Sequence, residues 1–388
     1  MNTFFSSLPA LKPDPLFSIA AEAKLAGPSV IDGTLGIFMD EAGKPVLLPS
    51  VRSAIKDLEK DLAGFNYSYP LLTGLPDYRA SVTNLLVEKN ADLVASIATA
   101  GGTGGLAVNL RLMHMLLEGT SRKMILPVPA WANHLPPSKA AGLQVMEVPY
   151  LQNGRASIEG ILAAVKKMTE PFGLLLQVGC HNPTGLDFAE SDWDELIRAL
   201  QQVPCVALLD SAYQGFKDEP EHDIVPVQKF IDAGITTLAT WSASKNHSIY
   251  GMRTGLACAF VSNEEEKQTV EGNYCSITRT MHSAAPTFGQ AIVARVQKDY
   301  ALQWREDLRA ARALMQRKRS LLQENLPDAF HASLQGYGMF AMLPLTSEQV
   351  VRLKTEENVF FPLDGRINIA GIPERRIGEL GKKILNVL

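Results

Sequence analysis

The feature that most constrains the fold is an alternation of short β-rich runs with helical stretches from about residue 90 to residue 265. The candidate strands are SIATA (96–100), KMILPV (123–128), GLLLQV (173–178), CVALLD (205–210), TTLATW (236–241) and LACAFV (256–261). The candidate helices include LAVNLRLMHMLL (106–117), SIEGILAAVKKM (157–168) and ESDWDELIRAL (190–200). Because strands connected through helices usually run parallel, this order predicts an α/β fold with a mostly parallel sheet wrapped by helices.

The two ends of the chain have a different pattern. Residues 1 to about 45 are rich in proline and glycine, and a long charged helix is expected over 301–326. A chain of 388 residues is long enough for two domains. We therefore expect an N-terminal arm (1–14), a small domain built from 15–42 and 305–388, and a large domain (43–304) that contains the alternating region.

Composition excludes several classes of partner. The formal net charge of -4 provides no basic surface for nucleic acid or an anionic membrane. No apolar run approaches the roughly 18 residues of a membrane span, and the first residues do not resemble a signal peptide. The seven histidines have no metal-ligand spacing, so no metal site is expected. A cytoplasmic enzyme that acts on small molecules is the simplest interpretation.

Polar residues follow four of the predicted strands at the point where each strand ends. These segments are Gly101–Gly104, Gly179–Gly185, Ser211–Gly215 and Ser242–Lys245. In open α/β sheets, ligands bind beyond the carboxyl ends of the strands. The sequence therefore predicts a ligand site formed by these four segments together.

Two of these positions carry reactive groups. Lys245, at a strand end among hydroxyls, can form an imine and move a proton, although a solvated surface lysine explains its position equally well. Asp210 closes an apolar strand, where a carboxylate needs a partner such as a protonated ring nitrogen. A helix or turn cap is the alternative for Asp210. Tyr213 can direct its hydroxyl to the same ring or serve only in packing.

The glycine-rich segment 101–105 precedes a predicted helix and offers backbone N–H groups for a phosphate, although a tight turn is an equally good interpretation. It matches neither a Walker motif nor G-x-G-x-x-G. The stretch Ser242–Lys245 also matches the S-x-x-K motif of penicillin-binding proteins. We reject that interpretation because the chain contains neither S-D-N nor K-T-G.

Six motifs together resemble one enzyme family. In chain order they are GGTGG (101–105), PAWANH (129–134), HNPTG (181–185), DSAYQGF (210–216), SASKNHSIYGMRTG (242–255) and GRINIAG (365–371). They resemble the fold type I pyridoxal-phosphate aminotransferases of the aspartate and aromatic subgroup, and they extend over nearly the whole chain. The resemblance implies a large cofactor-binding domain with a seven-stranded, mostly parallel sheet and a smaller α/β domain.

The resemblance also assigns roles around pyridoxal 5'-phosphate. Lys245 matches the lysine that holds the cofactor as a Schiff base and later moves the substrate proton, and Asp210 matches the partner of the pyridine nitrogen. The other matches are Tyr213 and Asn182 at the phenolic oxygen, Trp131 on the ring, Gly102, Thr103, Ser242 and Arg253 at the phosphate, and His134 behind the aspartate.

Substrate and subunit contacts follow from the same resemblance. Arg366 matches the arginine that grips the substrate α-carboxylate, and Gly36 lies where a backbone group approaches that carboxylate; Trp131 and Asn182 also border the substrate. Tyr69 matches a residue that reaches the neighbouring subunit's phosphate, and Arg279 one that reaches a distal substrate carboxylate across the interface. The resemblance therefore implies a homodimer with shared active sites.

The expected reaction is a ping-pong transamination between an L-amino acid and 2-oxoglutarate. Gln177 stands where many members have histidine. Met39, Ser68 and Ala284 stand near the side-chain pocket, at positions that aspartate-preferring members tend to fill with Lys or Asn, whereas Arg279 favours acidic substrates. Aspartate and aromatic donors, tyrosine and phenylalanine, are therefore equally expected. The alternatives are another pyridoxal-phosphate reaction, such as a lyase or decarboxylase, and a non-catalytic binding protein.

Overall fold

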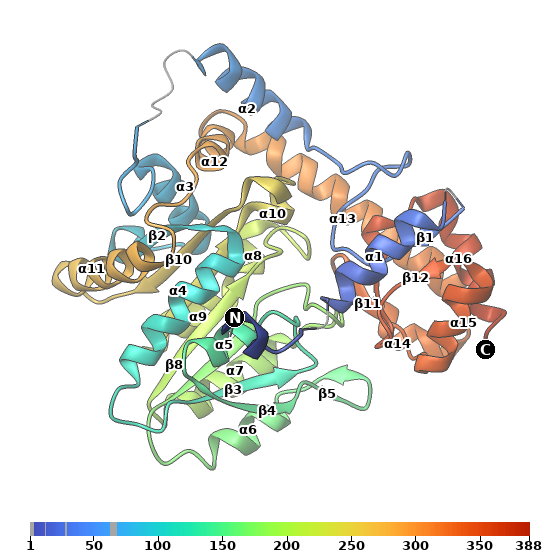
Figure 1. The fold of residues 1–388 in the computed structure, drawn as a ribbon. Helices are drawn as coiled ribbons and strands as arrows, with labels where there is room; N and C mark the ends of the chain where they lie inside the picture. Colours follow the sequence, from blue (N-terminus) through green and yellow to red (C-terminus); the bar gives the residue numbers. More distant parts are fainter. Residues whose placement is uncertain (1–3, 12, 28, 63–67) are drawn as a thin grey trace.

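A computed structural model describes residues 4–11, 13–27, 29–62 and 68–388 of the chain. Its centre is a seven-stranded sheet with the strand order β2-β10-β9-β8-β7-β3-β4 (Figure 1). In that order the strands are β2 (Val94–Ala100), β10 (Thr254–Phe260), β9 (Thr236–Ser242), β8 (Cys205–Ser211), β7 (Phe172–Gln177), β3 (Lys123–Val128) and β4 (Gln144–Pro149). Only β10 runs antiparallel to its neighbours in this sheet of the described chain, so the prediction of a mostly parallel sheet is confirmed.

The sequence predicted six of these strands within two residues and missed β4. That strand lies at the edge of the sheet, pairs only with β3, and is largely exposed or half-buried. It therefore lacks the continuous apolar run that identifies the central strands, which are buried on both faces.

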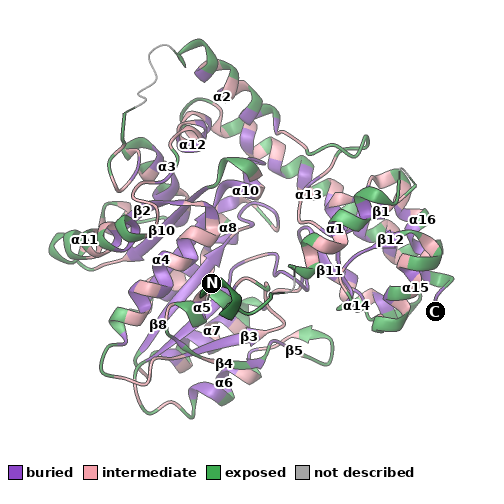
Figure 2. Cartoon of the chain, in the orientation of Figure 1, coloured by how far each residue is buried: buried purple, intermediate pink, exposed green. Residues whose placement is uncertain are grey.

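Alternate residues of the central strands pack into two separate cores. Leu174 and Leu209 belong to the core on one face of the sheet, whereas their chain neighbours Leu175 and Leu208 belong to the core on the other. This is the period-2 alternation of a β-strand. The helices whose side chains enter the second core are α4 (Gly101–Leu116) and α11 (Glu264–Met281). Those that enter the first core include α2 (Pro49–Lys60), α3 (Pro76–Leu86), α6 (Glu159–Val165), α7 (Glu190–Leu200), α9 (Val225–Asp232) and α12 (Phe288–Asp299). Figure 2 shows the buried strands between helices whose outer faces are exposed.

A second body lies beside the sheet and joins the two ends of the chain. Strand β1 (Ile31–Asp32) pairs parallel with β12 (Val359–Phe360), and β11 (Phe340–Met342) pairs antiparallel with β13 (Arg366–Asn368). The surrounding helices are α1 (Pro15–Leu25), α14 (His331–Leu334), α15 (Ser347–Glu357) and α16 (Ile377–Leu385) (Figure 1). This body has a core of its own, which includes Ile31 and Ile377.

The long helix α13 (Ala301–Glu324) connects the two bodies. Trp304 and Leu308, near its start, are buried in the core of the sheet body, and Leu322, near its end, is buried in the core of the second body. One helix therefore fixes the distance between the carboxyl ends of the strands and the strands β11 and β13.

Candidate active site

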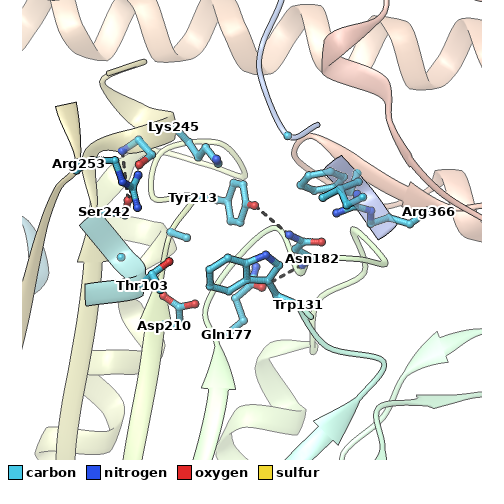
Figure 3. Close-up of a pocket in the computed structure, with 16 residues that line it drawn as sticks. Thr103, Trp131, Gln177, Asn182, Asp210, Tyr213, Ser242, Lys245, Arg253 and Arg366 are labelled. Atoms are coloured by element: carbon cyan, nitrogen blue, oxygen red, sulfur yellow. Dashed lines mark hydrogen bonds between the residues drawn. The ribbon is translucent and has the colours of Figure 1, made fainter. Parts of the chain in front are cut away.

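A cavity at the carboxyl ends of the parallel strands collects nearly all of the predicted site residues (Figure 3). It is lined by Leu16, Gly36, Gly102, Thr103, Trp131, Gln177, Asn182, Asp210, Ala212, Tyr213, Ser242, Ser244, Lys245, Arg253, Phe340 and Arg366. The lining comes from both bodies, since β11 and β13 contribute Phe340 and Arg366. Lys245 is therefore a cavity residue and not a solvated surface lysine.

Asp210 lies at the end of β8 and is held from behind by a histidine. Nε2 of His134 lies 2.8 Å from Oδ2 of Asp210, and both side chains are buried. The ring of Trp131 packs edge-on against the His134 ring, with 5.4 Å between the ring centroids. A carboxylate in this setting retains an oxygen for a cationic partner inside the cavity, because the histidine contacts only one of the two.

Asn182 and Tyr213 form a polar pair on the loops that follow β7 and β8. The side-chain amide of Asn182 donates to the Tyr213 hydroxyl at 3.3 Å, and the backbone N–H of Asn182 donates to Oε1 of Gln177 at 3.1 Å. Oδ1 of Asn182 is buried and has no hydrogen-bond partner among the described residues. A buried acceptor of this kind needs a donor, which a bound molecule can supply.

One end of the cavity is built to hold an anion. The helix α4 begins there, and its first turn presents Gly102 and Thr103 beside Ser242 and Arg253. A Cβ atom at Gly101, where φ is +73°, would lie only 2.6 Å from Nη2 of Arg253. Glycine therefore lets the guanidinium approach the helix N-terminus, whose N–H groups and dipole favour negative charge.

Lys245 projects from the short helix α10 (Ala243–Asn246) into the middle of the cavity. Removal from bulk water and the positive charges of Arg253 and Arg366 lower the pKa of its amine to about 8. Nζ of Lys245 also lies 4.9 Å from the centre of the Tyr250 ring. The Tyr250 hydroxyl accepts the backbone N–H of Phe38 at 2.9 Å, which ties this ring to the second body. A neutral amine is thus readily available near physiological pH.

The opposite end of the cavity carries a second cation. Nη2 of Arg366 donates to the carbonyl oxygen of Thr34 at 2.9 Å, and its guanidinium carbon lies 4.9 Å from the centre of the Phe340 ring. Burial lowers the pKa of Arg366. Gly36 packs against the same ring, because a Cβ there would lie 2.6 Å from Cζ of Phe340. This guanidinium keeps donors free for a carboxylate.

Figure 3 shows Arg253, Ser242 and Thr103 at one side of the cavity and Arg366 at the other, with Lys245, Tyr213 and Asn182 between them. A molecule with a phosphate, a ring and an aldehyde fits the first end and the middle, and an amino acid carboxylate fits the second end. The orphaned acceptor of Asn182 and the glycine-lined helix start are consistent with pyridoxal phosphate as the resident group.

Five residues singled out in the sequence do not line the cavity of the single chain. Tyr69 is 97% exposed, and Arg279 donates to Ser283 at 3.0 Å on the outside of α11. Met39, Ser68 and Ala284, which were expected near the side-chain pocket, also lie outside the lining, whereas Gln177 lies within it.

Four lining residues were not predicted as site residues. Ala212 and Ser244 lie inside recognised motifs and follow from their neighbours. Leu16 and Phe340 belong to segments that reach the cavity only through the packing of the second body, so no local pattern marks them.

Across the described ranges, no three His, Cys, Asp or Glu side chains gather as a metal site. Likewise, no helix in the described part of the chain is long and apolar enough to cross a membrane.

Comparisons with known proteins agree with this geometry. Residues 30–384 match the family described as aminotransferase class I and II. The chain is 30% identical over 393 residues to a tyrosine aminotransferase of Rhizobium meliloti (strain 1021), covering 99% of this chain and 100% of that protein. It is 30% identical over 405 residues to a mitochondrial aspartate aminotransferase of Xenopus tropicalis, covering 100% of this chain and 93% of that protein.

A solved structure has the same architecture. An aromatic-amino-acid aminotransferase from Burkholderia pseudomallei, covalently bound to pyridoxal phosphate, superposes with a TM-score of 0.92 at 30% identity and covers 100% of both chains. The fold is therefore that of the fold type I pyridoxal-phosphate enzymes. Together with the buried amine between two cationic ends, these matches show that the chain belongs to the class I and II aminotransferases and carries out pyridoxal-phosphate-dependent transamination.

Proposed function

We propose that the enzyme transfers the amino group of aspartate or an aromatic L-amino acid, tyrosine or phenylalanine, to 2-oxoglutarate. The observation that carries this proposal is a single cavity in which Lys245 lies between the guanidinium groups of Arg253 and Arg366. One cation serves the cofactor phosphate and the other the substrate α-carboxylate, so the substrate Cα lies near the amine.

Pyridoxal phosphate, when bound, supplies an aldehyde carbon that accepts an amine and a protonated ring that withdraws electrons from the substrate Cα. Gly102, Thr103, Ser242 and Arg253 hold its phosphate in this proposal. Asp210 would pair with the ring nitrogen, Tyr213 and Asn182 would hydrogen-bond the phenolic oxygen, and Trp131 would pack on the ring, since all four side chains line the cavity. These positions keep the ring charged and oriented.

Lys245 performs the proton transfer. Its pKa of about 8 leaves about a tenth of the amine neutral at pH 7, so Nζ can take the proton from the substrate Cα and return it to the cofactor carbon. Arg366 meanwhile fixes the carboxylate, so that the Cα–H bond points toward that nitrogen. The same steps in reverse convert the oxo acid acceptor to its amino acid.

Two kinds of side chain support the choice of substrates: apolar residues that line the cavity and a cation from a second subunit. Trp131, Phe340 and Leu16 provide apolar surface for an aromatic ring. Arg279 provides a cation for a distal carboxylate if it comes from a second subunit. Relatives named tyrosine aminotransferase and aspartate aminotransferase are consistent with either use.

We propose a homodimer with shared sites, because two matched residues lie outside the cavity of their own chain. Tyr69 is 97% exposed, a state that is unusual for a large aromatic side chain and suits contact with a partner. The N-terminal segment adds Phe4 and Phe5, which are 94% and 81% exposed. Such an arm is suited to lie on another subunit.

We also propose the division into an arm (1–14), a small domain (15–42 and 305–388) and a large domain (43–304). The core of the second body supports this division, and Leu308 and Phe340 of the small domain pack into the core of the sheet body. A cytoplasmic location is part of the proposal. It is supported by the four cysteines, Cys180, Cys205, Cys258 and Cys275, all of which are free thiols as in a reducing compartment.

The test of the reaction compares the wild type with Lys245→Ala, using aspartate, tyrosine and phenylalanine as donors and 2-oxoglutarate as acceptor. We expect glutamate and the matching oxo acid as products from the wild type and none from the variant. Decarboxylated or eliminated products from the wild type would contradict transamination, and substantial turnover by the variant would contradict the role of Lys245.

Subunit sharing is tested by mixing two defective variants, Lys245→Ala and Arg279→Ala, under conditions that exchange subunits. In a mixed dimer with shared sites, one site combines Lys245 and Arg279 from different chains and is intact. We therefore expect aspartate transamination to return to about half of the wild-type rate per mixed dimer. No gain over the separate variants would overturn the sharing of Arg279.

A further inference from the structure

Arg319, in the last third of α13, is a buried cation that the proposed reaction does not use. Its side chain is 1% exposed, and burial lowers its pKa to about 10. Its hydrogen bonds go to backbone carbonyls: Nη2 donates to Tyr337 at 2.8 Å, to Gly338 at 3.2 Å and to Phe340. Burying a charge costs free energy. The carbonyl oxygens offset this cost only while the guanidinium stays in contact with them, so they hold it in one position.

The backbone that Arg319 binds is pressed against the HNPTG loop. The N–H of Tyr337 donates to the carbonyl oxygen of Gly185 at 2.8 Å. A Cβ at Gly185 would lie 2.7 Å from Nη2 of Arg319, and one at Gly338 would lie 2.5 Å from Cβ of Cys180. The guanidinium therefore lies where the turn 336–340 contacts the loop 180–185 without intervening side chains. This contact between the two segments is called the joint.

Each side of this joint leads directly into the active site. The loop continues to Asn182, whose amide donates to the Tyr213 hydroxyl. The turn ends at Phe340, whose ring lies 4.9 Å from the guanidinium carbon of Arg366 and 6.3 Å from the centre of the Tyr213 ring, edge to face. A shift of the turn would therefore move the ring on which Arg366 rests.

We propose that Arg319 is a positioning residue for the carboxylate end of the site: it locks the turn 336–340 onto the loop 180–185 and thereby fixes Phe340 and Arg366. The inference rests on the proposed function in one respect, since it gives Arg366 the substrate carboxylate. Arg319 itself touches neither substrate nor cofactor. Its loss affects carboxylate binding before it affects the cofactor, which is held at the other end.

The test uses the holoenzymes of Arg319→Met and Arg319→Lys and two unreactive carboxylates, succinate and 3-phenylpropanoate. A matched control is Arg312→Met, because Arg312 lies two turns earlier on α13 and also donates to backbone carbonyls, those of Gly215 and Asp218. The readouts are the cofactor absorption band, the dissociation constant of each probe from the shift of that band, and kcat and KM with each donor.

We expect Arg319→Met to retain the cofactor band and to raise the dissociation constants of both probes, and KM, at least about tenfold, in line with the loss of a charged hydrogen-bonding group. Arg319→Lys should restore binding in part, and Arg312→Met should bind both probes within about twofold of the wild type. Unchanged probe binding in a folded Arg319→Met holoenzyme overturns the proposal, as does a folded Arg319→Met protein that no longer retains the cofactor band.

A second variant covers the case in which Arg319→Met does not fold. Gly338→Ala keeps Arg319 but forces the turn away from Cys180, whereas Gly234→Ala has a similar positive φ (+72°, against +69° at Gly338) and no atom within 4 Å of the added carbon. Weaker probe binding in Gly338→Ala alone supports the joint, and equal binding in both overturns it. Failure of the proposed function is distinguishable, because the wild type itself would then form no glutamate from an amino donor and 2-oxoglutarate, whatever the variants bind.

Discussion

Nε2 of His134 lies 2.8 Å from Oδ2 of Asp210, and both side chains are buried. The contact restrains one oxygen of the carboxylate, and the proposed reaction uses the other oxygen for the cofactor ring. In the proposed reaction the histidine acts through the aspartate and not through direct contact with the substrate.

The first prediction concerns this pair. Asp210→Ala removes the charge that faces the ring nitrogen, so we expect kcat to fall by about 1,000-fold. His134→Ala leaves Oδ2 of Asp210 without its donor and should lower kcat by about tenfold, the effect of one lost hydrogen bond. His134→Gln, which can still donate, should recover part of the loss. Steady-state kinetics with aspartate measures all three, and equal kcat in His134→Ala and the wild type would reduce His134 to a packing role.

The second prediction compares two glycines at opposite ends of α4. Gly101 and Gly119 both have positive φ, +73° and +82°, but only at Gly101 would a Cβ meet Arg253. The left-handed backbone alone makes alanine cost about 1–2 kcal/mol of stability at either position. We expect Gly101→Ala alone to weaken pyridoxal phosphate binding, by at least about tenfold, because the guanidinium must move. Equilibrium dialysis of the cofactor measures this, and equal affinity in the two variants would contradict the anion site at the helix start.

The third prediction follows from the lowered pKa of Lys245, about 8 in the folded protein against 10.5 for the unperturbed group. As pH falls from 10.5 to 8, the unfolded chain binds this proton before the folded chain does, so the stability of the cofactor-free protein decreases. Below pH 8 the loss is complete, on the order of 3 kcal/mol.

Lys245→Met removes this cost. In the cofactor-free form, we expect the variant to have a higher free energy of unfolding than the wild type at pH 7 and a much smaller advantage at pH 10. Urea unfolding at the two pH values measures the difference. An advantage that does not change with pH would mean that packing, and not the charge, separates the two proteins.

The fourth prediction addresses the carboxylate end. Arg366→Ala should lower kcat/KM about 100-fold with every donor, because each charge-assisted hydrogen bond contributes about 1.5–3 kcal/mol. Arg366→Lys keeps the charge but loses the planar fork, so it should recover only part of the activity. Arg375→Ala, at a side chain that is 69% exposed, is the control and should have no effect. A loss confined to dicarboxylic donors would show that Arg366 binds the distal group instead.

Sequence reasoning succeeded where the relevant signal was local. Lys245, Asp210 and the glycines at 101–105 follow apolar strands directly, so their meeting at one edge of the sheet follows from the strand pattern. The antiparallel direction of β10 was not predicted, because an apolar run shows that a strand exists and not which way it points. Leu16 and Phe340 were missed because their place in the cavity depends on how the second body packs, which is a long-range property.

The pairing of β1 with β12 and the hydrogen bond from Arg366 to Thr34 join segments more than 300 positions apart. During synthesis on the ribosome, the sheet and its Lys245 emerge well before the strand that carries Arg366. On the proposed assignment, the half that would hold the cofactor can therefore fold first, whereas the half that would bind the substrate carboxylate has to wait for the last stretch of polypeptide. A chain released a few dozen codons too early is expected to bind pyridoxal phosphate but not the carboxylate of an amino acid.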